Sequence, residues 1–400
     1  MLSMPLQFLT LTFWIQDRYP DQAVLFVSLI FGVRGSAMLL MSFLGGAIAD
    51  RYQRRRVLLG TEAGNALITI YLGLVMITMP FGDASIALIL IGTFLAASSM
   101  ALDAPARSAS IPSVVRMEEM PAAIGLNMLV SWIMFPIVLP FAGWMNDQFD
   151  PGRVYLGSAL LWVAILPIIA SLRYESRGDP SLKKGIIKDI QAGLQYSWKH
   201  SAIFAVISLV VVLHVIGMPG PGQLGPLWMT DVLGLTRAQF GLMGMTWGLG
   251  AVAGSIFLTM RPGLARRGSS LCFAVLLFAV CDIVWGHSRF IPLTAVANVG
   301  LGFAMAMSMV TAQTLLQYFA SEEMRGRVMG LMPLVMGMSM LGSLPVGLTA
   351  QATSLEVVVP ALAWITLAVG GSIVLLRPEL RRATGGLSTR VIPASRVTSA

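Results

Sequence analysis

The sequence predicts an all-α protein that crosses a membrane many times. Charged residues make up only 12% of the 400 residues, about half of the roughly 25% found in soluble globular chains. Hydrophobic residues reach 56% and the mean hydropathy is +0.78. Long apolar runs are separated by short polar, proline or glycine gaps. Inside lipid, a helix pairs its backbone groups within one segment, so we expect helices throughout.

Eleven stretches are long enough to span a bilayer, whose hydrocarbon core of about 30 Å requires roughly 20 apolar residues per helix. They lie at 22–47, 57–79, 84–105, 121–144, 153–172, 202–220, 236–260, 269–287, 289–312, 328–350 and 357–376.

The first 15 residues, MLSMPLQFLTLTFWI, are also apolar but end at the polar segment Gln16-Asp17-Arg18. A helix of this length extends about 22 Å, which is too short to cross the bilayer. We interpret it as the outer part of a first helix whose beginning is missing, through a truncated gene or a late start codon. A short re-entrant segment is the alternative.

Basic residues predict the orientation, because Lys and Arg are enriched in cytoplasmic loops. If residues 48–56 are cytoplasmic and the loops alternate from there, 22 of the 27 basic residues lie inside. The four outside are Arg18, Arg153, Arg237 and Arg289, and Arg34 falls within a span. This distribution attributes the net charge of +8 to membrane topology rather than to a nucleic-acid partner, and it predicts a cytoplasmic C-terminus.

The same topology predicts two bundles of six helices each. We expect an N-terminal bundle with an incomplete first helix at 1–172 and a cytoplasmic linker at 173–200. A C-terminal bundle follows at 201–377, and a disordered cytoplasmic tail at 378–400.

Two patterns favour this division. In the linker, Ile186, Ile190, Leu194 and Trp198 recur every four residues among lysines, which predicts an amphipathic helix on the inner membrane surface. The triplet Glu-Glu-Met occurs at 118–120 and again at 322–324, each time between the fourth and fifth helix of its half. Equivalent placement of the triplet favours an internal duplication.

We count the apolar N-terminal segment as helix 1, so the span 22–47 is helix 2. Residues 45–58, at and after the end of helix 2, read GGAIADRYQRRRVL. They resemble the G-x-x-x-D-R-x-G-R-R motif between helices 2 and 3 of the major facilitator superfamily. Gly46, Asp50, Arg51, Arg54 and Arg55 match, and Gln53 replaces the second glycine. An acid flanked by arginines at a helix end can pair with a helix dipole and a neighbouring carboxylate. The resemblance implies a conformational gate, whereas a topology anchor would explain the arginines alone.

Two further segments resemble one branch of this superfamily, which contains the enterobactin exporter and related efflux proteins. Residues 102–112, LDAPARSASIP, are similar to its D-A-P-A-R-x-A…P stretch, and residues 325–331, RGRVMGL, to its R-G-R-V-M-G element. The resemblance implies that these segments supply partners of the gate, and that Asp103 could pair with Arg54 or Arg55. The implied partners are Asp103, Arg107, Arg325, Gly326 and Arg327.

The span 121–144, which is helix 5 when the N-terminal segment is counted, contains LPFAGW at 139–144. This sequence resembles the G-P-x-x-G-G motif of antiporters in helix 5. Pro140 and Gly143 are retained and the flanking glycines are lost. Small residues allow helices to approach closely, and we expect the large Trp144 to prevent that approach locally. The prediction of export therefore depends on the branch resemblance more than on this motif.

Ionisable residues within spans are costly unless they are paired or face a water-filled path. Arg34, near the membrane midplane, is a candidate for contact with an anionic substrate, with a structural ion pair as the alternative. Glu62 lies at about the depth of Asp103 and is a candidate for binding substrate or a proton. Asp282 is the deepest acid and a candidate proton acceptor, with a hydrogen-bonded structural role as the alternative.

The resemblance implies a secondary active transporter in a bacterial inner membrane, a monomer with two bundles around a central cavity. We expect proton-coupled export of an amphipathic small molecule, such as a siderophore or drug, by alternating access. The proton gradient would supply the driving force without a cofactor. The alternatives are uptake by the same fold, or an inactive remnant that lacks helix 1.

An intramembrane enzyme is the competing class. Residues 146–150, NDQFD, resemble the acidic metal-diphosphate motif of prenyltransferases, but the chain contains no second acidic cluster of this kind. It also contains no nucleotide-binding P-loop motif and no H-E-x-x-H zinc signature. We therefore expect no enzymatic activity and no metal site.

Overall fold

The computed structural model describes residues 3–51, 53–79, 82–110, 120–171 and 186–383, except for the side chains of 42–51, 54, 108–109, 120–132, 135 and 186–190. Helices connected by short turns account for nearly all of this part of the chain, and it contains no β-strand. Among the described residues, nine helices are long and apolar enough to cross a membrane. A tenth span results if the pair 191–199 and 201–217, which is bent by 111°, counts as one. The predicted all-α membrane fold is confirmed.

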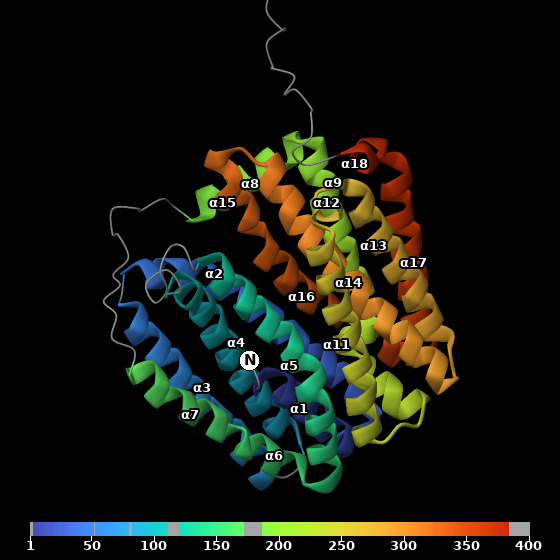
Figure 1. Ribbon diagram of the computed structural model, residues 1–400. Coiled ribbons are helices and arrows are strands. Elements are labelled where there is room, and N and C mark those ends of the chain that lie inside the picture. The colour runs from blue at the N-terminus through green and yellow to red at the C-terminus, as the bar shows by residue number, and fades with distance from the viewer. Residues whose placement is uncertain (1–2, 52, 80–81, 111–119, 172–185, 384–400) are drawn as a thin grey trace, which may run out of the picture.

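The first half of the chain forms one bundle (Figure 1). Its helices are α1 (Ser3–Arg18), α2 (Ala23–Arg51), α3 (Arg54–Thr78), α4 (Asp83–Ser110), α5 (Met120–Gln148), α6 (Pro151–Gly157) and α7 (Ala159–Ser171). The span predicted at 153–172 is thus divided into α6 and α7 at Ser158, whose hydroxyl donates to the carbonyl oxygen of Tyr155. Helix α1 packs within the bundle, and its residues Leu9, Phe13 and Ile15 are fully buried.

The second half forms the other bundle, preceded by α8 (Ile186–Lys199). Its long helices are α9 (Ser201–Val211), α11 (Arg237–Met260), α13 (Gly268–His287), α14 (Ile291–Phe319), α16 (Leu331–Ala352) and α17 (Leu355–Leu376). Short helices α12 (Pro262–Ala265), α15 (Glu322–Met329) and α18 (Pro378–Arg382) lie between or after them. The expected disordered tail therefore begins with a helical turn, whose Leu380 is buried; residues 384–400 lie outside the described part.

The span predicted at 202–220 extends further in the structure. After α9 the chain continues through wide helical turns to Val232. The prolines of the sequence PGPG at 219–222 lack a backbone N–H, so they cannot complete the ordinary helical ladder. Instead, the N–H groups of Met218 and Leu224 each bond to a carbonyl five residues back. Sequence periodicity does not reveal such a change of turn, so the predicted span ends at residue 220.

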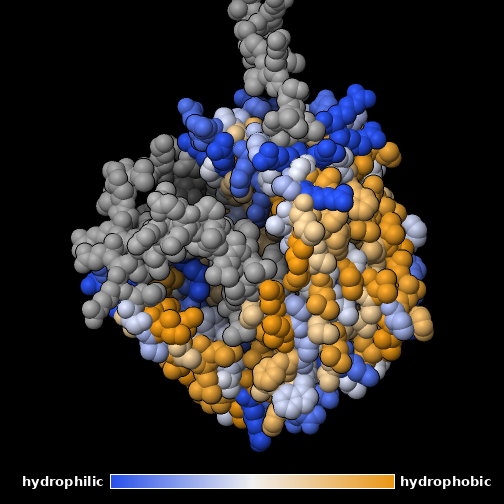
Figure 2. Space-filling model, viewed as in Figure 1, coloured by the Kyte–Doolittle hydropathy of each residue, from blue (hydrophilic) through white to orange (hydrophobic). Residues whose placement is uncertain are grey.

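The flanks of the molecule are apolar. Figure 2 shows hydrophobic residues over the sides of the second bundle and polar residues at the end where α8 and α18 lie. Large apolar side chains point outward on both bundles, including Leu160 of α7 and Leu376 of α17, which are 72% and 78% exposed. Such exposure of apolar surface fits contact with lipid hydrocarbon rather than water.

The two bundles meet through two helix pairs, α2 with α16 and α5 with α11. Glycines line both contacts and bring the backbones close together. A Cβ atom on Gly35 would lie 2.6 Å from the carbonyl oxygen of Gly337, and one on Gly241 would lie 2.5 Å from that of Leu139. Small residues allow this close approach between membrane helices. We call the end where α5 ends and α11 begins the Arg237 end, and the opposite one the Arg107 end.

Candidate functional site

A cluster of charged side chains joins α3 and α4 near the Arg107 end. The Arg107 guanidinium lies 2.6 Å from Glu62 Oε1 and 2.8 Å from Asp103 Oδ2. The hydroxyl of Thr61 donates a further hydrogen bond to Asp103. Both acids are buried, Glu62 almost completely, and Glu62 Oε2 has no partner among the described residues. Two carboxyl groups therefore share one guanidinium.

The predicted pairing of Asp103 with Arg55 is wrong. Arg107 lies one helical turn beyond Asp103 on the same helix, so it reaches the carboxylate at the i, i+4 spacing that favours contact. Arg55 instead donates to the backbone carbonyls of Ile169 and Ala170 at the end of α7. The side chain of Arg54, the other predicted partner, lies outside the described part.

The predicted gate motif spans the end of α2 and the start of α3. Gly46, Asp50 and Arg51 belong to the last turns of α2, and Arg54 begins α3. Their side chains are outside the described part, so their role as a gate stays a prediction.

The second set of predicted gate residues lies in the other bundle, on α15. The Arg325 side chain donates to the carbonyl oxygen of Gln317, and a guanidinium nitrogen of Arg327 lies 3.3 Å from the sulfur of Met324. A Cβ atom on Gly326 would meet no atom within 4 Å. Helix α15 packs against α8 and α14. The structure thus brings Asp103 and Arg107 together but leaves Arg325–Arg327 in the opposite bundle.

A polar contact between the bundles closes the Arg237 end. Arg237, the first residue of α11, pairs with Asp17 at the end of α1 and donates at 3.0 Å to the carbonyl oxygen of Asn146 on α5. Gln16, beside Asp17, donates to Thr230 at 2.7 Å and to Asp231. We call these residues the Arg237 latch. The latch was missed in the sequence, although Arg237 stands out as one of four basic residues on the predicted outer side.

Burial raises the pKa of Asp17 in the Arg237 latch above its usual value, against the opposing effect of the Arg237 guanidinium, and Asp150 nearby adds to the rise. A group whose pKa is higher in the closed contact stabilises that contact in acid, and this stabilisation is lost as the pH rises through the raised value.

We expect Arg237→Gln to open the Arg237 end more often. The Asp17–Arg237 pair is partly exposed, so its loss should cost about 0.2–1 kcal/mol, or up to about a fivefold change in the opening equilibrium. The measurement is the rate at which a membrane-impermeant maleimide labels a cysteine at the buried Ala142, in a chain without its native Cys272 and Cys281.

The same assay tests the pH dependence of the latch. Because a thiol itself reacts faster at alkaline pH, each rate is compared with that of Asp17→Asn at the same pH, and this relative rate should be lower at acid than at alkaline pH. Arg153→Gln, which removes an exposed arginine from α6, is the matched control and should leave the rate unchanged. Equal rates for Arg237→Gln and the parent chain would contradict the latch.

Gly143, from the predicted helix 5 motif, packs directly on α11. A Cβ atom there would meet the carbonyl oxygen of Arg237 and would lie 2.9 Å from Gly241 Cα. The expectation that Trp144 prevents close approach is wrong, because this side chain points away from α11 and is 49% exposed. Pro140 lies in the same contact, with its Cα 2.9 Å from a Cβ placed on Gly241.

Asp282 lies in α13, inside the second bundle. Its side chain is 1% exposed, and neither carboxyl oxygen has a hydrogen-bond partner among the described residues. The hydrogen-bonded structural role that the sequence left open for Asp282 thus has no support from its described neighbours.

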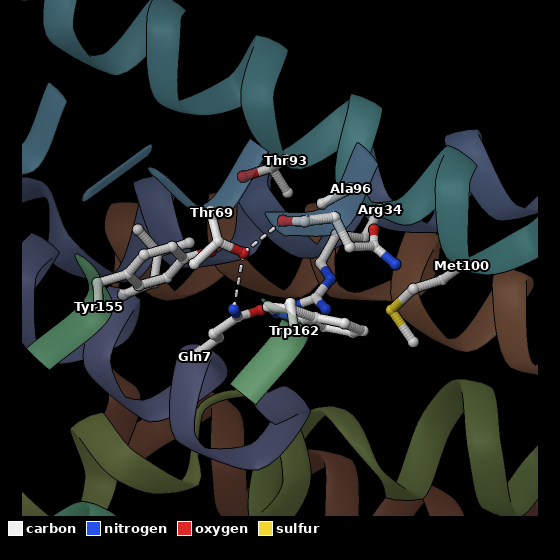
Figure 3. A pocket seen from close by; sticks show the side chains of 10 residues that line it. Gln7, Arg34, Thr69, Thr93, Ala96, Met100, Tyr155 and Trp162 are labelled. Carbon is white, nitrogen blue, oxygen red and sulfur yellow. Dashed lines mark hydrogen bonds between the residues drawn. The ribbon is translucent and has the colours of Figure 1, made fainter. Parts of the chain in front are cut away.

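Arg34 points into a pocket inside the first bundle (Figure 3). The pocket has an accessible volume of about 20 Å³, room for about one water molecule, and Gln7, Asn65, Thr93 and Trp162 also line it. Arg34 makes no hydrogen bond or ion pair with any residue that the structure describes. The pocket is formed by helices of one bundle, not between the two bundles.

Comparison with known proteins shows the same kind of molecule. Residues 15–392 match the family model of the transmembrane secretion effectors. The multidrug efflux pump Tap of Mycolicibacterium fortuitum is 22% identical over 357 residues, which cover 86% of this chain and 85% of the pump. The enterobactin exporter EntS of Escherichia coli O1:K1 is 24% identical over 373 residues, covering 89% of this chain and 84% of the exporter.

Solved structures support the fold. An inward-facing, occupied structure of a bacterial homologue of the lysosomal transporter Spinster matches with a TM-score of 0.71 at 13% identity, covering 95% of this chain and 96% of that one. The family model covers most of the sequence. The chain is therefore a multi-pass membrane protein that belongs to the transmembrane secretion effector family, an exporter-like branch of the major facilitator superfamily of transporters.

Proposed function

We propose that this protein is a proton-coupled exporter that moves an amphipathic small molecule out of a bacterial cell by alternating access. The observation that carries the proposal is the uneven contact between its two bundles. Within the described residues, every hydrogen bond that joins the bundles lies at the Arg237 end or between Ser343 of α16 and Ser28, near the start of α2. A transporter waiting for an internal substrate is closed on the outer side in this way.

The charge distribution supports the orientation that this proposal requires. The Arg107 end carries the basic loops, and these favour the cytoplasmic side of a membrane. The Arg237 end would then face outward, and the C-terminus would be cytoplasmic. Figure 1 shows α8 and α15 of the second bundle apart from the ends of α2 and α4 at the Arg107 end. In this orientation, the hydrogen bonds between the bundles that the structure describes lie toward the outer side.

The glycine contacts provide a physical basis for movement between two states. Backbone surfaces without side chains between them can separate and rejoin with little repacking, so α2 could move on α16 and α5 on α11. The Asp17–Arg237 ion pair of the Arg237 latch is partly exposed to solvent. It is therefore weak enough to open in each cycle. The two bundles would move as rigid bodies around the substrate.

We assign proton carriage to Asp282 rather than to Glu62. Glu62 already has a guanidinium partner at 2.6 Å, whereas the carboxyl of Asp282 is buried and unpartnered among the described residues. An ionised carboxylate there would be an uncompensated buried charge. Binding and release of a proton at Asp282 would therefore change the energy of the second bundle.

Transport into inverted membrane vesicles tests the proposal. With an acidic vesicle interior, the parent chain should accumulate an amphipathic compound inside, because protons leaving the lumen drive the compound inward. The panel consists of novobiocin, chloramphenicol and ethidium, which are acidic, neutral and cationic, and is followed by mass spectrometry. A protonophore should abolish accumulation, and Asp282→Asn should remove its dependence on the gradient.

The outcomes separate the proposal from its alternatives. Accumulation that does not respond to the pH gradient would overturn proton antiport. Accumulation only in right-side-out vesicles would support uptake instead, and no movement of any compound in either orientation would favour an inactive protein. Glu62→Gln should remain responsive to the gradient; loss of that response in Glu62→Gln alone would transfer the proton-binding role to Glu62.

A further inference from the structure

The pocket around Arg34 is unusually rich in hydrogen-bond donors. Besides the guanidinium, the indole N–H of Trp162 and the hydroxyl of Thr93 face no partner among the described residues, although both are buried. The amide of Asn65 also lines the pocket, and Gln7 donates to Thr69 and Ser158 at its edge. In Figure 3, the side chains of Gln7, Arg34, Thr69 and Trp162 point toward the pocket interior.

No acid balances these donors. The described residues that line the pocket include neither Asp nor Glu. Glu62, a candidate acid in the same bundle, is already held by Arg107. A guanidinium at this depth is costly without an anionic partner or water. The arrangement therefore has a positive charge and unused donors directed at one space.

We propose that this pocket is an anion-binding site, and that it holds the carboxylate of an acidic substrate during export. Identification of the anion as substrate rests on the proposed function, whereas anion binding does not. A carboxylate offers two oxygens to the planar fork of Arg34 and further lone pairs to Trp162 and Asn65. Leu11, Ala96 and Met100 line the remaining surface, and the apolar part of such a molecule would lie outside this small pocket.

Equilibrium binding to the purified full-length chain tests the site with benzoate and benzamide. The two probes have nearly the same shape, but only benzoate carries a charge at neutral pH. Benzoate should bind at least about tenfold more tightly than benzamide, because charge-assisted hydrogen bonds are about twice as strong as neutral ones. Arg34→Gln should remove this preference. Arg34→Lys should retain part of it, since the charge remains but the bidentate fork is lost.

Two controls isolate the pocket. Arg153→Gln removes an exposed arginine elsewhere in the same bundle and should bind benzoate like the parent chain. Thermal unfolding of each variant shows whether it is folded, and Arg34→Lys keeps the test valid if Arg34→Gln does not fold. Equal benzoate binding by parent and Arg34→Gln, or equal affinity for benzoate and benzamide, would overturn the anion site.

Two further experiments decide which kind of anion the site binds and whether that anion is the exported substrate. Binding of benzoate in both gluconate and chloride buffers supports a carboxylate site, whereas its loss in chloride buffer would identify a halide site and overturn the substrate assignment. If a carboxylate compound such as fusidate is exported equally by the parent chain and Arg34→Gln, the proposed function stands and the substrate assignment fails. If the parent chain exports nothing but binds benzoate through Arg34, the anion site stands and the proposed function fails.

Discussion

Replacing Arg107 with glutamine is expected to lower the free energy of unfolding by about 3 kcal/mol. The substitution leaves Glu62, which is 1% exposed, and Asp103 without their shared guanidinium. Removing one partner of a buried ion pair costs about 3–5 kcal/mol, because the other charge is left uncompensated. We expect the lower end of this range since the Arg107 side chain is itself 38% exposed. Chemical unfolding in mixed detergent micelles measures the change.

A second substitution distinguishes the lost ion pair from general damage. Arg107→Gln combined with Glu62→Gln removes the more deeply buried of the two uncompensated charges and leaves that of Asp103, so it should recover most of the lost stability. Arg153→Gln, on the exposed surface of α6, is the matched control and should have no measurable effect. Equal destabilisation in the single and double variants would show that the pair is not the source of the loss.

Enlarging Gly143 is expected to reduce export about tenfold with alanine and more with leucine. The added Cβ would meet the carbonyl oxygen of Arg237 and the Cα of Gly241, both of which are backbone atoms that cannot rotate away. Overpacking of this kind costs about 1–3 kcal/mol, and it is relieved when α5 and α11 separate. A cost of about 1.4 kcal/mol is a tenfold change in the equilibrium between the two states.

Initial transport rates in inverted vesicles measure this effect, and labelling of a cysteine at Ala142 should increase in parallel. Gly157→Ala is the matched control, because a Cβ at Gly157 meets no atom within 4 Å. It should leave both transport and labelling unchanged. Normal transport by Gly143→Leu would mean that the α5–α11 contact is not closed during the cycle.

The sequence predicted the membrane helices well because lipid imposes a simple rule on them. Each span must be apolar over a nearly fixed length, and this requirement is visible in any stretch of the chain without knowledge of its neighbours. The ends of the helices were predicted less accurately. Helix α14 continues to Phe319, beyond the predicted end at 312, since Leu315 and Leu316 pack in the core. The PGPG turns at 219–222 also remain helical through wide hydrogen bonds.

The candidate sites were only partly predictable. The family resemblance named Asp103 and Arg107 among the gate partners, but their contact with each other at one-turn spacing came from the structure. Glu62 was recognised as an important acid, but its contact with Arg107 joins residues that are 45 positions apart. The Arg237 latch joins residues 220 positions apart, and no local pattern encodes such a contact.

The sequence by itself determined the helical class, the number and order of most spans, the distribution of positive charge and the resemblance to secretion effectors. These properties depend on the transfer of side chains between water and lipid, and each residue contributes to them regardless of its partners. Only the tertiary structure decided that Gly143 contacts α11, that Arg34 faces an acid-free pocket, and that the bundles meet at the Arg237 end. Those properties depend on which helix faces pack together, because pairing and close approach act over a few ångströms between segments distant in the chain.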